Sequence, residues 1–153
     1  MKKLIFILAS SFFCFQHIYS QELDTIPISS NKLTLGFFQD GGSLIGFDFE
    51  QLVTENIGLS VGAGFLGFGA SIHYHLKPAV NSSSIAFNYL HQGIGDTYFQ
   101  SAIGPSYVIK ISKLFSGQLG MAGIIDNGPK FYEFYEEGKE PEIMLIYSLG
   151  VYF

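Results

Sequence analysis

Apolar residues occupy every second position in one segment of this chain after another. The clearest case is the segment 57–65, where the intervening positions are glycine or serine. Its apolar positions are Ile57, Leu59, Val61, Ala63 and Phe65. A period of two is the spacing of side chains along one face of a β-strand. The alternation therefore predicts strands, and few other elements are compatible with it.

Eight segments share this alternation, and turn sequences such as "DGG" and "TEN" separate them. The expected strands are 32–39, 43–52, 57–65, 68–76, 84–92, 98–112, 116–125 and 143–153. Most of them approach the roughly 9–11 residues that a tilted strand needs to cross a membrane. A length of 153 residues suits a single domain. The sequence thus predicts an all-β domain of eight strands.

The two faces of the predicted strands differ in size and polarity. One face is large, aliphatic and aromatic, whereas the other is mostly Gly, Ser and Ala with a few charges, and charged residues make up only 14% of the chain. A soluble barrel turns its apolar face inward and a charged face outward. Here the bulky face would overfill a small core, and the glycine face would be a poor coat against water. The inverse arrangement fits, with bulky residues toward lipid and small or polar residues toward a narrow lumen.

Lipid cannot satisfy backbone hydrogen-bonding groups, so a sheet in a membrane must close on itself. The predicted fold is therefore an eight-stranded antiparallel up-and-down transmembrane β-barrel. An eight-stranded lumen leaves no room for a wide water pore. The alternative is a secreted soluble barrel of the lipocalin kind that binds a small apolar ligand.

The amino-terminal segment 1–20 is typical of a secretory signal peptide. Lys2 and Lys3 precede the apolar stretch 4–15, and Ser20 is a small residue before the expected cleavage site. The mature barrel domain would then be 21–153. Cleavage would remove two lysines and no acid, which changes the net charge from −5 to −7.

Lipidation at Cys14 is an alternative for this segment, but Phe12 and Phe13 stand where a lipoprotein signal requires small residues. Cys14 is also the only cysteine, so the mature domain would carry no disulfide. The chain contains no arginine and is acidic, which excludes a basic nucleic-acid-binding face. The bidentate arginine contact that often holds phosphate groups is missing as well.

The chain ends in "EIMLIYSLGVYF", with apolar residues at alternate positions up to a terminal phenylalanine. The outward set of this ending is Leu145, Tyr147, Leu149, Val151 and Phe153. With the signal peptide and the hairpin "IGLSVGAGFLGFGASIHYHL", this ending resembles the small eight-stranded outer-membrane barrels of the OmpA/OmpX-like type. The resemblance implies the outer membrane of a Gram-negative cell, contact with its lipid, and recognition of the ending by the barrel-assembly machinery. Those families have several long outer loops, whereas only the last is long here, which argues against an adhesion role.

Five titratable residues occupy strand positions that face the predicted lumen, and the direction of their strands places all five at its periplasmic end. This lumen charge cluster consists of Asp48, Glu50, His73, His75 and Lys110. Lys32, at the start of the first strand, has the same parity. The favoured interpretation is a salt-bridged plug in which the acids lie against Lys110 and a protonated histidine. The alternative is a metal site in which His73 and His75 bind with Asp48 or Glu50. We expect the plug, and no metal or cofactor.

Two further features have functional and structural interpretations. His91 lies near the outer end, as in barrels that deacylate lipid, but its parity is outward and the chain has no His-x-Ser sequence, so we expect no enzyme. The last outer loop, 126–142, combines acids with the aromatic residues Phe131, Tyr132, Phe134 and Tyr135. It is either a binding loop for a cation, glycan or protein, or a set of interfacial anchors, which we favour. The extracellular ligand stays open.

Overall fold

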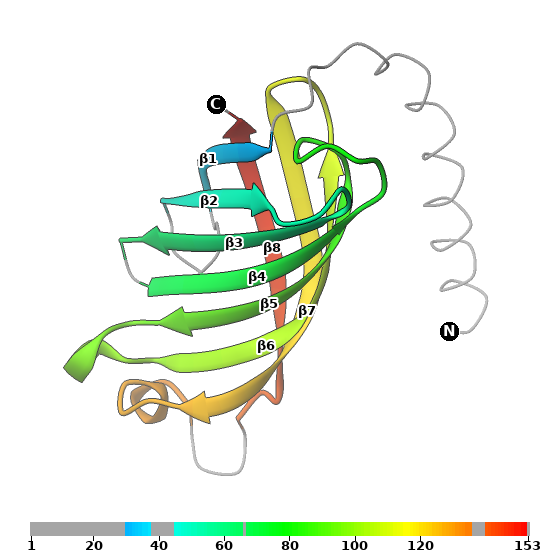
Figure 1. Ribbon diagram of the computed structural model, residues 1–153. Helices are drawn as coiled ribbons and strands as arrows, with labels where there is room; N and C mark the ends of the chain where they lie inside the picture. The colour runs from blue at the N-terminus through cyan, green and yellow to red at the C-terminus, as the bar shows by residue number, and fades with distance from the viewer. Residues whose placement is uncertain (1–29, 38–44, 66, 136–139, 153) are drawn as a thin grey trace, which may run out of the picture.

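The computed structural model describes residues 30–37, 45–65, 67–135 and 140–152. Eight antiparallel strands follow one another around a closed barrel in the order β1 to β8, and β8 pairs with β1 (Figure 1). The strands are β1 (Asn31–Phe37), β2 (Gly46–Leu52), β3 (Ile57–Gly64), β4 (Gly67–His75), β5 (Ser84–Gln92), β6 (Gln100–Lys110), β7 (Phe115–Asn127) and β8 (Ile143–Tyr152). Two short 3-10 turns, η1 (Gly95–Thr97) and η2 (Phe131–Glu133), lie in loops.

The prediction of an all-β fold with eight antiparallel strands is confirmed. The bounds differ mainly at β6 and β7. β6 begins at Gln100 rather than at 98, because η1 ends in a hydrogen bond from the Tyr98 N–H to the Gly95 carbonyl. β7 continues to Asn127, past a register shift between Ser101 and Ala102 on β6. The signal peptide 1–20, the "DGG" turn and Phe153 lie outside the described residues.

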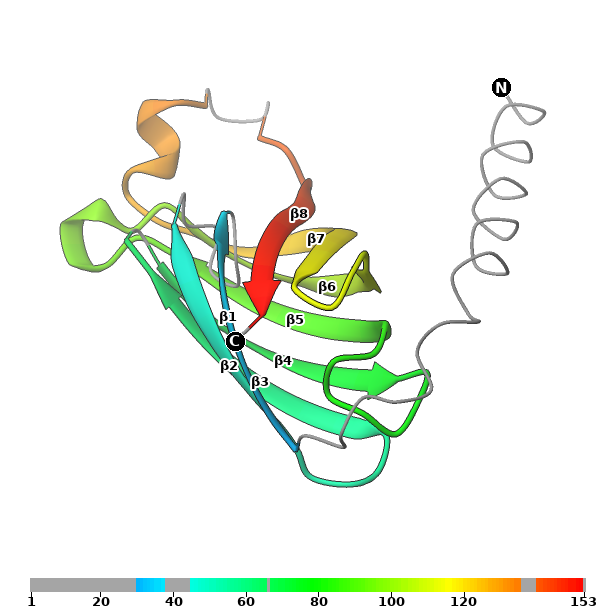
Figure 2. The same ribbon diagram turned by 90° about the horizontal axis from the view of Figure 1, so that it is seen from above.

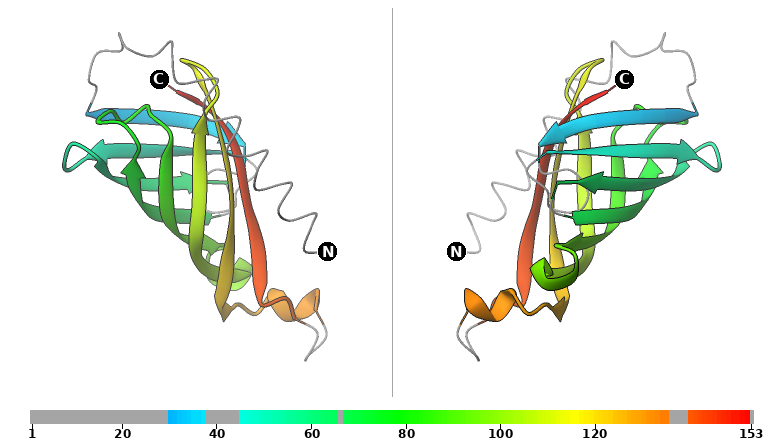
Figure 3. Two further views of the ribbon diagram at one scale, coloured as in Figure 1. Left: turned by 90° about the vertical axis from the view of Figure 1, so that its right-hand side faces the viewer. Right: turned by 90° about the vertical axis from the view of Figure 1, so that its left-hand side faces the viewer.

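The strands are staggered around the barrel. Successive cross-strand partners of Thr34 are Asp48, Gly62, Gly69, Leu90, Ala102 and Ile124. The last of these, Ile124, donates its N–H to the carbonyl of Glu142, just before β8. Thr34, where the circuit began, pairs instead with Tyr152. One circuit of the barrel therefore shifts the register by 10 residues, from residue 142 to residue 152. Figure 3 shows the resulting steep tilt, with β6 to β8 running across the direction of β1 to β3, and Figure 2 gives the view from above. An eight-stranded barrel of this kind has an interior that side chains fill.

The barrel is polar inside and apolar outside, as the two faces of the sequence predict. Buried polar side chains on the strands include Lys32, Thr34, Asp48, Glu50, Ser60, Ser71, His73, His75, Ser84, Asn88, Ser106, Lys110, Ser116 and Ser148. The outward set is large and apolar, and Val61 and Leu145 are 60% and 63% exposed. A soluble fold places such side chains in its core. In this barrel Leu90, Ala102, Ala122 and Ile146 form a small apolar cluster, against which Ile124 and Met144 pack.

The two ends of the barrel differ. We call the end at which β1 starts and β8 finishes the terminal end, and its turns are 53–56, 76–83 and 111–114. The opposite end, which we call the loop end, has the β3–β4 hairpin, the loop 93–99 with η1, and the connection from β7 to β8 with η2. In Figure 1 the arrowhead of β8 lies at the terminal end, and η2, in orange, lies at the opposite end.

Two glycines allow β6 and β7 to approach closely. A Cβ atom on Gly104 would lie 2.2 Å from the Met121 carbonyl oxygen, and one on Gly120 would lie 2.4 Å from the Pro105 carbonyl oxygen. Pro105 has no N–H to donate, and the Cα pairing of these strands passes from Ile103–Gly123 to Ser106–Gly120. Glycine is required at both positions because the opposing atoms belong to the backbone.

Candidate functional site

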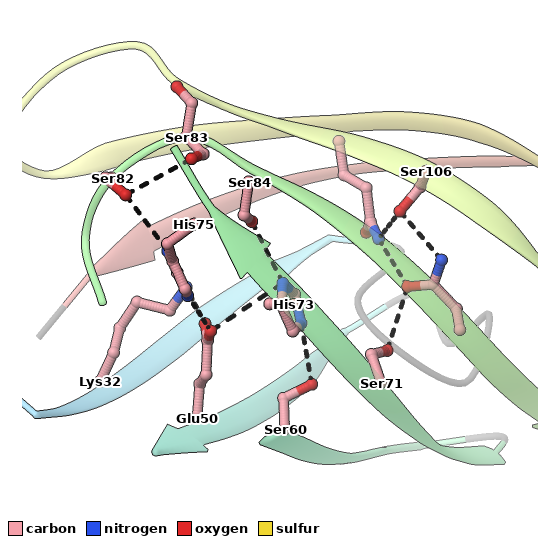
Figure 4. A network of polar contacts seen from close by, with 12 residues as sticks. Lys32, Glu50, Ser60, Ser71, His73, His75, Ser82, Ser83, Ser84 and Ser106 are labelled. Carbon is pink, nitrogen blue, oxygen red and sulfur yellow. Dashed lines mark hydrogen bonds and ion pairs between the residues drawn. The ribbon is translucent and has the colours of Figure 1, made fainter. Parts of the chain in front are cut away.

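Glu50 is the centre of the polar cluster in the lumen near the terminal end. Its Oε2 atom forms an ion pair with Lys32 Nζ at 2.5 Å, and its Oε1 atom lies 2.6 Å from His75 Nε2 (Figure 4). His73 Nδ1 lies 3.9 Å from the same Oε1 atom. A carboxylate only accepts hydrogen bonds, so His75 Nε2 carries a proton and donates it. Lys32 is the cross-strand partner of Glu50, and this register brings the ammonium to the carboxylate.

Serine hydroxyls surround the two imidazoles. His73 Nε2 lies 3.1 Å from Ser60 Oγ, and His73 Nδ1 lies 3.2 Å from Ser84 Oγ. His75 Nδ1 lies 3.2 Å from Ser82 Oγ. The two rings are stacked with their centroids 6.0 Å apart. All four ring nitrogens therefore have a polar partner within the protein.

Gly58 on β3 makes room for the contact between Glu50 and His75. β2 and β4 are not neighbours, because β3 lies between them. A Cβ atom on Gly58 would lie 3.1 Å from His75 Nε2 and within contact distance of the Glu50 carboxylate. The carboxylate and the imidazole thus meet directly over the backbone of β3, in space that any other residue would occupy.

Asp48 and Lys110 are both buried in the lumen, but they do not join the Glu50 contacts. Asp48 helps to line a cavity of about 30 Å³, which is large enough for ordered water. The cavity walls are formed by Lys32, Thr34, Asp48, Glu50, Ser60, His73, Val108, Ser116, Gln118 and Ser148. The ammonium of Lys110 lies 5.5 Å from the centre of the Tyr152 ring. In the described residues it forms no ion pair with Asp48 or Glu50, so Lys32 holds the position that was expected for Lys110.

A second polar network closes the lumen farther from the terminal end. Its centre is Asn88, which is fully buried and whose Oδ1 atom accepts hydrogen bonds from Ser71 and Gln118. The Asn88 amide donates to the Gly104 carbonyl and to Ser106 Oγ, at 2.9 Å each. Ser148 on β8 donates to Gln118 Oε1 at 3.0 Å. Together these side chains connect β4, β5, β6, β7 and β8 across the interior; Figure 4 shows Ser71 and Ser106 within it.

A row of outward residues lies at one level near the loop end. Phe68, His91, Ser101 and Asp126 are successive cross-strand partners on β4 to β7. His91 Nδ1 lies 2.8 Å from Ser101 Oγ, and the His91 ring stacks on Phe68 at a centroid distance of 4.5 Å. The outward parity predicted for His91 is confirmed. In the described residues no carboxylate contacts His91, since Asp126 reaches only as far as Tyr98.

Tyr98 covers this row from the loop between β5 and β6. Its ring stacks on His91 at 4.6 Å, and its hydroxyl donates to Asp126 Oδ2 at 2.8 Å. The same hydroxyl lies 2.9 Å from Ser101 Oγ. Partial burial, together with the nearby carboxylate of Asp126, raises the pKa of the Tyr98 phenol above its usual value. The serine is therefore covered by aromatic rings and is 4% exposed.

The aromatic residues of the last loop have unequal environments. Phe131 is fully buried and packs against Phe99 and Tyr135, with centroids 5.3 and 4.8 Å apart. Phe134 and Tyr132 are 74% and 55% exposed at the loop end. The loop therefore has its own small core, and two of its aromatic side chains face outward.

All five residues of the predicted lumen charge cluster point inward and are buried at the terminal end. Glu50, His73 and His75 are in contact, whereas Asp48 lies on the cavity wall and Lys110 lies over Tyr152. Sequence reasoning placed Lys32 inward but omitted it from the cluster. It also missed Gln118 and the serines that contact the histidines. The sequence feature that could have identified them is their place at the alternate strand positions that face the lumen.

Comparison with family models, with curated proteins and with solved structures finds no match to this chain. Among the described residues, no group of three or more His, Cys, Asp or Glu side chains is arranged to hold a metal ion. No helix in the same part of the chain is long and apolar enough to cross a membrane.

Proposed function

We propose that this protein is a small outer-membrane β-barrel of structural or binding type, similar to the OmpA/OmpX-like barrels, with a plugged lumen and no wide pore. Its surroundings would be outer-membrane lipid, and the barrel-assembly machinery would be its partner during biogenesis. The terminal end would face the periplasm and the loop end the exterior. The signal peptide predicted at 1–20 is consistent with export.

One observation carries this proposal, namely the outward exposure of large apolar residues on all the strands. Each strand from β2 to β8 presents at least one such residue that is more than a third exposed; examples are Phe47, Val61, Ile72, Phe87, Ile103, Leu119 and Leu149. An apolar surface that encircles a closed barrel cannot be covered by the barrel itself. Lipid is the environment that suits such a surface, because a closed sheet satisfies its own backbone groups.

The lumen networks support a plugged barrel of structural or binding type. Asn88 and Gln118 join side chains of five strands through hydrogen bonds, and Glu50 joins Lys32 to His75 nearer the terminal end. A general porin needs an open aqueous path along its axis. The two cross-linked layers of side chains support a plugged lumen rather than such a path.

We also propose that the protein is not an enzyme. His91 and Ser101 are in contact on the outer surface, but Ser101 is covered by Tyr98. A nucleophilic serine requires a base that is itself oriented by a third group, and in the described residues His91 has no carboxylate partner. Binding at the loop end is the remaining functional role, and the exposed Phe134 and Tyr132 are the residues that would make contact.

A lipocalin-like carrier is less compatible with this interior. Pockets for small apolar ligands are usually several hundred cubic ångströms and mostly apolar. The cavity that the described residues line in this lumen is about 30 Å³, and its lining includes Lys32, Asp48, Glu50 and His73. An apolar ligand would have to displace buried ion pairs, which is unfavourable.

Cell fractionation tests the proposal directly. We expect the protein in the outer-membrane fraction, resistant to extraction by alkaline carbonate and released by detergent. An unheated sample should also migrate differently from a boiled sample in a denaturing gel, because the closed barrel resists the detergent. Recovery of folded protein in the soluble periplasmic or secreted fraction without detergent would contradict the membrane proposal and favour the soluble carrier.

A further inference from the structure

Lys110 has a buried ammonium group that forms no ion pair with an acid among the described residues. The residue is 7% exposed, and its Nζ atom has no hydrogen-bond partner in that part of the chain. The ammonium lies over the face of the Tyr152 ring, 5.5 Å from the ring centre. An ammonium removed from water and left without acceptors is costly, because a cation–π contact replaces only part of its hydration.

Tyr152 adds a second donor without an acceptor at the same place. Its side chain is 6% exposed, and its buried hydroxyl oxygen has no hydrogen-bond partner among the residues that the structure describes. Buried polar groups in proteins are paired in the great majority of cases, with protein, water or ions. The Lys110 ammonium and the Tyr152 hydroxyl are thus two hydrogen-bond donors without an acceptor among the described residues, both at the terminal end of the lumen.

The charges near Lys110 are positive. Lys32 approaches the same Tyr152 ring, with its Nζ atom 4.9 Å from the ring centre. Lys113 lies in the turn that directly follows Lys110. Three lysines therefore converge on this part of the barrel. Their combined potential favours a negative charge.

The acids of the lumen are held elsewhere. Glu50 is occupied by Lys32 and His75 on the side of β2, and β6, which carries Lys110, lies opposite β2 in the ring of eight strands. Asp48 is also on β2 and faces the cavity next to Lys32. Among the described residues, neither carboxylate forms an ion pair with Lys110.

We propose that Lys110 and Tyr152 form a binding site for a small anion, of which chloride is the simplest example. The ammonium supplies charge and N–H donors, and the Tyr152 hydroxyl supplies one O–H donor. The anion would enter from the terminal end, since Lys110 is the last residue of β6 before the turn 111–114. The proposal goes beyond the membrane proposal and does not depend on it, because both candidate barrels have the same lumen.

The test measures chloride binding to the purified full-length barrel in a non-ionic detergent. Exchange with a protein site broadens the ³⁵Cl nuclear magnetic resonance line, so the wild type should give excess line width that inorganic phosphate or further chloride reduces by competition. Lys110→Met keeps the length of the side chain and removes its charge, and should reduce the line width to that of detergent alone. Lys77→Met removes an equal charge from an exposed position in the turn 76–83, outside the proposed site, and should keep the broadening.

Tyr152→Phe provides a second variant if Lys110→Met does not fold. It removes only the hydroxyl donor and should weaken chloride binding by about tenfold, the loss expected for one hydrogen bond to an ion. The wild type should also unfold at a higher temperature in sodium chloride than in sodium isethionate, whose anion is too bulky for the lumen. The absence of broadening in the wild type, or equal broadening in wild type and Lys110→Met, would overturn the proposal. Either result would mean that Lys110 is buried without an anion.

Discussion

Glu50 and His75 meet across an intervening strand, with Oε1 and Nε2 2.6 Å apart and both side chains almost completely buried. The contact passes over Gly58 of β3, which contributes no side chain. Three neighbouring strands are thus joined through their interior faces as well as through their backbone ladders. This relationship makes the terminal end of the lumen sensitive to small changes in volume and charge.

Replacement of Gly58 by alanine should destabilise the barrel. The added methyl group would overlap the Glu50 carboxylate and press on His75 Nε2, which must then separate. Overpacking of this kind costs about 1–3 kcal/mol. Gly123→Ala is the matched control, since the nearest atom to its Cβ would be 4.0 Å away. Urea unfolding of the refolded variants measures the difference in unfolding free energy. Equal stabilities would show that the side chains around Gly58 rearrange at little cost.

Loss of Lys32 should be more harmful than loss of most lumen residues. Lys32→Met would leave the buried Glu50 carboxylate without its ammonium partner, and removal of one member of a buried ion pair costs about 3–5 kcal/mol. Glu50→Gln removes the other charge. The double variant should lose less stability than the sum of the single variants, because neither charge is then stranded. Additive losses in unfolding free energy would mean that the pair contributes little.

Chelation should leave the melting temperature of the purified barrel unchanged. Both histidines of the lumen already have polar partners on each ring nitrogen, so no imidazole lone pair is positioned for zinc. The comparison is a thermal melt with and without a chelator, followed by addition of zinc. A sharp fall on chelation that zinc reverses would replace the plug with a metal-binding lumen.

Ile72 distinguishes a membrane barrel from a soluble one. Its side chain is 56% exposed on the outward face of β4. In a bilayer, Ile72→Lys would place a charge against lipid and cost roughly 2–4 kcal/mol near the midplane. In water the same change at an exposed site would be nearly neutral. Ile111→Lys, which lies beyond the end of β6, is the control and should cost much less. Folding yield into lipid vesicles reports the difference between the two variants.

The carboxyl-terminal pattern should direct assembly. Phe153 lies outside the described residues, but Leu145, Tyr147 and Leu149 project from the outer face of β8, as the sequence predicts. If the ending is read by the assembly machinery, Phe153→Asp should accumulate as protease-sensitive protein in the periplasm. The matched change Phe134→Asp, in the last loop, should leave the yield unaffected. Equal amounts of Phe153→Asp and wild type in the outer membrane would remove this support for the membrane proposal.

The sequence predicts whether a strand residue points into the lumen or outward, because side chains alternate along a strand. It also predicts at which end of the barrel the residue lies, because the direction of each strand is known. Asp48, Glu50, His73, His75 and Lys110 were therefore placed inward and at one end, where they lie. Their partners could not be predicted in the same way. Contacts across a lumen depend on the stagger between distant strands, and a stagger accumulates over all the turns of the chain. Lys32 rather than Lys110 reaches Glu50 for this reason.

The uncharged network was harder to anticipate than the charged one. Gln118 lies on β7, where glycines and a register shift obscure the alternation. Its contacts with Asn88 and Ser148 require three strands to be aligned at one level. Phe131 was grouped with the exposed aromatic residues of its loop, yet it is fully buried, because Phe99 precedes the shortened β6 and packs against it. Composition alone does not distinguish an anchor from a small local core.

The close approach of β6 and β7 has a consequence for how this sequence can drift over evolutionary time. Outward positions can exchange one apolar residue for another at little cost, so relatives could diverge there until their similarity is hard to detect. Gly104 and Gly120 have no such freedom, because each faces a carbonyl oxygen of the opposite strand at a distance that excludes a methyl group. A substitution at either position would require both strands to separate. These two glycines, with Pro105 next to Gly104 on β6, are therefore positions by which a distant descendant of this barrel could still be recognised.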